Sequence, residues 1–332
     1  MCYNHPMSLD QYGRRIDYLR ISLTDQCNLR CVYCMPEDMT FQPSANLLQD
    51  HELLRLARIF SGLGFAKFRL TGGEPTIREN VVGLVQQLAA LPGVREVAMT
   101  TNGILLKHLA RPLAEAGLTR LNISLDTLDA KKFRQLTRWG NVDDVMRGIR
   151  AAEEAGFPIK LNAVVVRGVN DREDAVELAR LTQEHAWQVR FIEMMPLGRI
   201  SDFQLSHIVS EDELRSTIEA ALGPMELLNG GTLDGEARMF RLANAPGSVG
   251  FISSVTKPFC AACNRARLTA DGKLRLCLLR DKELDLLNLL RGGANDEELA
   301  ALIEKSIWYK PWGHGLAEHS YPTHRVMSEI GG

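Results

Sequence analysis

The chain has 332 residues, more than one ordinary hydrophobic core usually supports, so we expect a large domain with a smaller second region. Its 39 basic and 41 acidic side chains give a formal charge of -2, without a run of like charge. This balance argues against nucleic acid or a lipid surface as a partner, so local charges must hold any anionic ligand. No uncharged apolar run reaches the length of a membrane span and no secretory signal is visible, which predicts a cytoplasmic protein.

Short β-rich runs alternate with longer amphipathic segments through the N-terminal half. Strands are expected over 18–24, 66–71, 95–101, 120–125, 159–166 and 188–194. Segments between them, such as 50–64, 79–91 and 171–185, repeat apolar residues every three or four positions, as helices do. This alternation predicts a parallel sheet with crossover helices, but it does not distinguish an open sheet from a barrel.

The pattern changes after the sixth expected strand. Residues 196–207 read as a loop, and a helix is expected after a capping box formed by Ser210 and Glu213. The segment 227–256 is rich in turn residues with short alternating runs, consistent with a few antiparallel strands, although 225–248 carries no functional signal. The final stretch reads as irregular and ends in EIGG.

Six of the seven cysteines form two triads. They are Cys27, Cys31 and Cys34 directly after the first strand, and Cys260, Cys263 and Cys277 beyond the sixth. In a reducing compartment, clustered thiols more often bind metal than form disulfides, whereas Cys2 stands alone without an assigned role. Structural zinc and ordinary electron-transfer clusters take four protein ligands, so a triad leaves one coordination position open.

Zinc is an alternative for the second triad, since Cys-x2-Cys pairs are common zinc ligands. His314, His319 or His324 could complete such a site. A non-catalytic iron-sulfur or zinc protein, used in electron transfer or assembly, therefore stays open on the cysteines alone.

The first triad has the spacing Cys-x3-Cys-x2-Cys with Tyr33 before its last cysteine, and TGGEP follows at 71–75. Alone, GGEP would be only a strand-to-helix turn. Together, these motifs resemble the radical S-adenosylmethionine superfamily. The resemblance implies an α/β fold with a partial (β/α)6 TIM-like barrel, a 4Fe-4S cluster whose fourth iron binds S-adenosylmethionine, and reductive formation of a 5′-deoxyadenosyl radical.

The second triad, the segment NRARLTADGKLRLC and the terminal RVMSEIGG resemble the GTP 3′,8-cyclase family of molybdenum cofactor biosynthesis, from about residue 14 to the last glycine. This resemblance implies a second 4Fe-4S cluster that binds the guanine of GTP. It also implies lyase chemistry, in which the 3′ hydrogen is abstracted and C3′ bonds to C8. The implied partners are an electron donor of the flavodoxin or ferredoxin class and the next pathway enzyme, cyclic pyranopterin monophosphate synthase, and a homodimer is left open.

The resemblance also implies domains and site residues. Residues 1–195 would form the barrel, and 196–332 would carry the second cluster and the GTP site. The expected S-adenosylmethionine contacts are Tyr33, Gly73, Ser124, Arg190 and Met195. The expected GTP contacts are Arg20, Arg69, Thr100, Lys160, Arg265 and Arg267. Gly331 and Gly332 are expected to enter the active site as bare backbone, although chain ends are ordinarily frayed.

The cations have independent support. A triphosphate needs cationic ligands, and the chain has no Gly-x4-Gly-Lys-Ser/Thr loop, so side chains must supply them. Lys67 joins the expected set because it lies on the second strand, although each of these cations taken alone reads as a surface charge. Arg265 and Arg267 alternate, so in an extended chain both point the same way. A peptide-modifying radical enzyme is the enzymatic alternative, but such enzymes usually carry more C-terminal cysteines.

Overall fold

The computed structural model describes residues 8–318 and 320–331. Within them, the strands form one sheet in the order β12-β11-β10-β1-β2-β3-β4-β5-β6-β9-β8-β7. The six central, parallel strands are β1 (Tyr18–Ser22), β2 (Lys67–Thr71), β3 (Glu96–Thr101), β4 (Arg120–Ser124), β5 (Ile159–Val165) and β6 (Gln188–Glu193). All six strands predicted from the sequence are therefore confirmed. The first and last strands of the order do not pair, so the sheet is a partial barrel.

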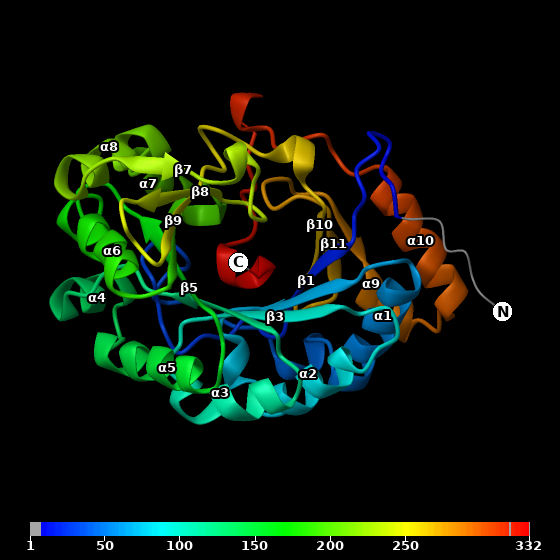
Figure 1. Cartoon of the computed structure of the whole chain (residues 1–332). Helices are drawn as coiled ribbons and strands as arrows, with labels where there is room; N and C mark the ends of the chain where they lie inside the picture. Colours follow the sequence, from blue (N-terminus) through cyan, green and yellow to red (C-terminus); the bar gives the residue numbers. More distant parts are fainter. Residues whose placement is uncertain (1–7, 319, 332) are drawn as a thin grey trace.

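Crossover helices cover the outer face of the curved sheet (Figure 1). They are α1 (Asp50–Gly62), α2 (Val81–Ala89), α3 (Leu106–Glu115), α4 (Ala130–Thr137), α5 (Val142–Glu154) and α6 (Glu173–Glu184). In α1, a capping box between Gln49 and Glu52 fixes the start, and Leu53, Leu56 and Phe60 are buried at helical spacing. None of the helices in the described ranges combines the length and apolar surface that a membrane span requires.

The C-terminal part of the chain extends the same sheet at both edges. Its strands are β7 (Met225–Leu227), β8 (Arg238–Leu242), β9 (Ser248–Ile252), β10 (Arg265–Leu268), β11 (Lys273–Arg275) and β12 (Glu283–Asp285). The antiparallel pairing expected over 227–256 joins β7 to β8 and β8 to β9, and antiparallel pairing not expected from the sequence joins β10 to β11 to β12. In addition, β10 pairs parallel with β1 and β9 pairs parallel with β6. These pairings satisfy the backbone groups at both edges of the six-stranded core and hold the two parts of the chain together.

Two predictions of irregular structure were wrong. The expected loop 196–207 contains α7 (Ser201–Ser206), where Gln204 donates from Nε2 to the carbonyl of Tyr33 at 2.9 Å, a tertiary contact without a local signal. The stretch beyond the second triad contains α9 (Leu286–Arg291), α10 (Asp296–Trp308) and α11 (Met327–Ile330). For α10 the sequence signal was present, since Asn295 and Glu298 form a capping box.

The helix expected after Ser210 is confirmed as α8 (Glu211–Leu222). The Ser210 hydroxyl accepts a hydrogen bond from the backbone amide of Glu213 at 3.3 Å. This half of the predicted capping box is present, and it satisfies one of the unpaired amides at the start of the helix.

Strand register lines up polar side chains along the inner face of the sheet. Ser124, Asn162 and Arg190 are paired in register across β4, β5 and β6. On the other side, Arg20 of β1 is in register with Arg267 of β10 and with Arg69 of β2. Because alternate residues of a strand share a face, register places these charges and hydrogen-bonding groups around one interior space.

Candidate active site

One cavity lies inside the curve of the sheet and is bounded by the carboxyl ends of the central strands. Parallel α/β sheets place their functional residues at this edge. All six cysteines of the two triads line this cavity, together with His314. The triads are far apart in sequence, and pairing between β1 and β10 brings them to opposite sides of one chamber.

Free thiols are the donors on both sides, and none of the six cysteines forms a disulfide. Among the residues that the structure describes, no group of three or more His, Cys, Asp or Glu is arranged to hold a single metal ion. An iron-sulfur cluster is wider than one ion and is held by thiolates at separate corners. Each set of three soft donors facing the chamber thus fits a cluster of this kind.

The thiols of the two triads differ in electrostatic environment. Burial raises the pKa of Cys27 to about 11 and that of Cys34 to about 12. Burial alone would also raise the pKa of Cys263, but the charges of Arg265 and Lys310 bring it down to about 6. Local cations therefore favour a thiolate at Cys263, whereas burial raises the pKa of Cys277 in the same triad and that of the first-triad thiols, which must release protons on binding a cluster.

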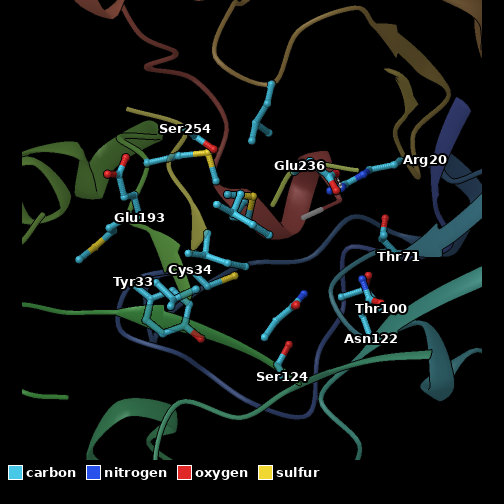
Figure 2. A pocket seen from close by; sticks show the side chains of 18 of the residues that line it. Arg20, Tyr33, Cys34, Thr71, Thr100, Asn122, Ser124, Glu193, Glu236 and Ser254 are labelled. Carbon is cyan, nitrogen blue, oxygen red and sulfur yellow. Dashed lines mark hydrogen bonds and ion pairs between the residues drawn. The ribbon is translucent and has the colours of Figure 1, made fainter. Parts of the chain in front are cut away.

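The expected S-adenosylmethionine contacts, Tyr33, Gly73, Ser124, Arg190 and Met195, all line the cavity. Figure 2 shows Tyr33 and Cys34 next to each other, with Ser124 on the neighbouring wall. The Tyr33 hydroxyl donates to Oδ2 of Asp126 at 2.6 Å. Arg190 is 2% exposed, and its Nε and Nη2 have no partner among the described residues. Such buried, unused donors fit a charged ligand such as a carboxylate.

The expected GTP contacts fall into two groups. Arg20, Thr100, Arg265 and Arg267 line the cavity, whereas Lys67, Arg69 and Lys160 are not among its lining residues. The buried Arg69 guanidinium donates to the hydroxyls of Tyr18 and Thr100, so it supports a lining residue from behind. Lys67 is the first residue of β2, at the end of the strand opposite to the carboxyl end that bounds the cavity, and it does not line the cavity.

The C-terminal tail enters the curve of the sheet (Figure 1). Ile330 packs in an apolar cluster with Leu197 and Leu279, and Met327 packs against this cluster, so the two residues anchor the tail. The carbonyl of Gly331 accepts a hydrogen bond from the Arg267 guanidinium. Gly331 has φ +82°, and a Cβ there would lie 2.6 Å from Oγ1 of Thr71, so only bare backbone fits. Gly332 lies outside the described residues.

Comparison with known proteins agrees with this geometry. Residues 21–181 match the Radical SAM superfamily, and residues 187–316 match Molybdenum Cofactor Synthesis C. Proteins named GTP 3′,8-cyclase from Thermodesulfovibrio yellowstonii and Moorella thermoacetica are each 46% identical, over 97% of this chain and 99% of the relative. One from Pseudomonas putida is 47% identical over 92% of both chains.

The chain belongs to the GTP 3′,8-cyclase family. The radical S-adenosylmethionine fold predicted from the first triad is confirmed. A crystal structure described as Streptococcus suis SuiB bound to S-adenosylmethionine shares this fold, with TM-score 0.58 and 17% identity over 89% of this chain and 68% of that one. Family membership supports an enzyme over a non-catalytic metal protein.

Of the two described histidines of the zinc alternative, one lines the cavity and the other does not. His314 lines the cavity, and its Nε2 has no partner in the described part of the chain. His324 is exposed and is not a lining residue. His319 and Cys2 lie outside the described residues.

Several residues around the chamber were missed from the sequence. Lys310 is buried and donates from Nζ to the carbonyls of Arg265 and Leu276. These hydrogen bonds link the two segments that carry Cys263 and Cys277. Asp234 and Glu236 bring carboxylates to the expected GTP cations. No periodicity identifies such residues, because their contacts come from strand pairing and loop packing.

Gly73 has a role that can be tested separately from ligand binding. Its amide donates to the carbonyl of Thr24 at 2.7 Å, and a Cβ at Gly73 would lie 2.0 Å from the carbonyl oxygen of Gln26. The Gly73→Ala variant should therefore displace the loop that carries Cys27, with loss of about four irons per chain, the content of one 4Fe-4S cluster.

The measurement is iron per chain after anaerobic reconstitution. Gly62→Ala is the matched control, because nothing lies within 4 Å of a Cβ at Gly62. Full iron content in Gly73→Ala would show that the loop tolerates the added methyl group.

Proposed function

We propose that this chain converts GTP to (8S)-3′,8-cyclo-7,8-dihydroguanosine 5′-triphosphate, the first step of molybdenum cofactor biosynthesis. The observation that carries the proposal is that two triads of free thiols face one chamber lined by four arginines. A radical must be formed close to the substrate, and a single chamber that contains both triads supplies this condition.

In this proposal, Cys27, Cys31 and Cys34 hold the cluster that binds S-adenosylmethionine, and Cys260, Cys263 and Cys277 hold the cluster that positions guanine. Reduced by one electron, the first cluster and S-adenosylmethionine supply a 5′-deoxyadenosyl radical for abstraction of the 3′ hydrogen. Tyr33, Gly73, Ser124, Arg190 and Met195 orient S-adenosylmethionine. The barrel, 1–195, would thus form the radical, and 196–332 would hold the base.

The triphosphate is assigned to the arginines. Arg20 and Arg267 are in register on adjacent strands, and Arg265 precedes Arg267 by two positions. Burial, with the charges of Arg20 and Arg265, lowers the pKa of Arg267 well below its ordinary value. A polyanion between these guanidiniums would relieve their mutual repulsion, which favours its binding at this place.

Arg265→Ala and Arg267→Ala should each weaken GTP binding about 10- to 150-fold, because a hydrogen bond to a charged group contributes roughly 1.5 to 3 kcal/mol. Guanosine, without phosphates, should be affected far less. Equilibrium dialysis under anaerobic conditions measures both affinities, with the exposed Arg58→Ala as control. An unchanged GTP affinity in both variants would remove these arginines from the site.

The function itself is tested by anaerobic incubation with dithionite, S-adenosylmethionine and GTP. Mass analysis should find 5′-deoxyadenosine and an isomer of GTP in equal amounts. About eight irons and no zinc per chain are expected for two clusters. Cleavage of S-adenosylmethionine without an isomer of GTP would point to another substrate.

Other proteins complete the reaction in this proposal. A flavodoxin or ferredoxin would donate two electrons in each turnover, since the chain has no further redox group of its own in the described chamber. One would cleave S-adenosylmethionine, and the second, with a proton, would reduce the nucleotide radical that remains after C3′ bonds to C8. Cyclic pyranopterin monophosphate synthase would take the cyclised product, and the oligomeric state, including a homodimer, stays open. Pull-down and sedimentation of the reconstituted protein test these interactions.

A further inference from the structure

An acidic turn enters the chamber from the strand connection β7–β8. Asp234 and Ala237 exchange two backbone hydrogen bonds, of 3.0 and 3.2 Å, and Gly235 between them has φ +65°. The turn therefore holds the side chains of Asp234 and Glu236 close together at its tip.

Glu236 is paired with two cations of the proposed triphosphate site, and Asp234 is paired with Lys160 beside it. Glu236 forms ion pairs with Arg20 and Arg265, and Figure 2 shows Glu236 and Arg20 reaching toward each other. Asp234 lies 3.1 Å from Nζ of Lys160 and accepts from Nε2 of Gln188 at 3.0 Å. Glu236 thus occupies two arginines that a triphosphate would need, and Asp234 fixes the turn beside them through Lys160.

The ion pairs hold the turn more than apolar packing does. The Glu236 side chain is 11% exposed, whereas no residue from 225 to 236 is buried as a whole. Burial alone would raise the pKa of Glu236, but the guanidiniums of Arg265 and Arg20 hold it well below its ordinary value. Segments with little buried apolar surface open at low cost, so an anion that takes the cations can release this turn.

We propose that Asp234 and Glu236 are substrate-site residues that set the affinity for the triphosphate. In the nucleotide-free protein Glu236 occupies Arg20 and Arg265 while Asp234 holds the turn against Lys160, and GTP binds with the turn displaced. The inference rests on the proposed function, because it assigns these cations to the phosphates. The apparent affinity for GTP is then the intrinsic affinity multiplied by the fraction of molecules in which the cations are free.

Equilibrium dialysis of the reconstituted protein tests the competition. Glu236→Gln should bind GTP about 3- to 10-fold more tightly than the parent, because the competing charge is lost while side-chain shape is kept. The affinity for inorganic tripolyphosphate should rise by a similar factor, and the affinity for guanosine should stay within about twofold of the parent value. Glu226→Gln is the matched control, since it removes a charge from an exposed position of the same hairpin.

Amide hydrogen exchange gives a second measurement on the unaltered protein. Exchange over residues 232–238 should become faster when GTP is added, while exchange in the cysteine loops slows. Slower exchange in the turn on addition of GTP, or unchanged or weaker GTP binding by Glu236→Gln, would overturn the inference and make the carboxylates a fixed support for the arginines. A parent protein that binds tripolyphosphate but not GTP would instead contradict the proposed function.

Discussion

Cys31→Ser is expected to abolish reductive cleavage of S-adenosylmethionine, even in the absence of GTP. Cys263→Ser is expected to keep part of this cleavage while producing no cyclised nucleotide. The difference follows from the neighbours of each cysteine, because Cys31 lies two positions before Tyr33, which is assigned to S-adenosylmethionine, whereas Cys263 interacts with Arg265, which is assigned to GTP. One triad would form the radical and the other would place the base.

The measurement is 5′-deoxyadenosine and the isomer of GTP in the same anaerobic reaction. Iron content of each variant serves as the control, since each should keep the irons of the intact triad. Equal loss of cleavage in the two variants would argue against a division of labour between the triads.

Removal of Gly331 and Gly332 should lower formation of the cyclised product about 100-fold, while both clusters and most GTP affinity are kept. A misplacement of about 1 Å can cost a factor of this size when reacting groups must be held in position. The physical reason is the contact between the Gly331 carbonyl and Arg267, which places the end of the chain against a lining residue of the chamber.

A second variant tests the same tail without shortening it. Arg325 holds the tail through Asp271 at 2.8 Å and through Glu283, to which Nη2 donates at 2.9 Å. Arg325→Ala should lower product formation in the same direction, and Arg325→Lys should restore part of it. Arg55→Ala, which breaks an outer ion pair with Asp296, is the control. A truncated chain that turns GTP over at the parent rate would show an ordinary frayed end.

The sequence alone determined the local elements and the chemistry of the thiols. The six central strands and their crossover helices follow from periodicities of two and 3.6 residues, which depend only on neighbours along the chain. The triad spacing and the glycine motif indicated the radical superfamily, and the terminal segment indicated the family. Four expected S-adenosylmethionine contacts line the cavity because they lie at or after the carboxyl ends of β1, β2, β4 and β6, and the fifth, Arg190, lies within β6.

Only the tertiary structure determined which residues meet at the chamber. The pairing of β10 with β1 and of β9 with β6 joins segments far apart in sequence, and no local pattern encodes such partners. This pairing brings the second triad to the chamber and leaves Lys67 outside it. It also carries the acidic turn, from a segment without a sequence signal, onto Arg20 and Arg265. Ion pairs of this kind depend on three-dimensional proximity, because charge attraction acts through space and not along the chain.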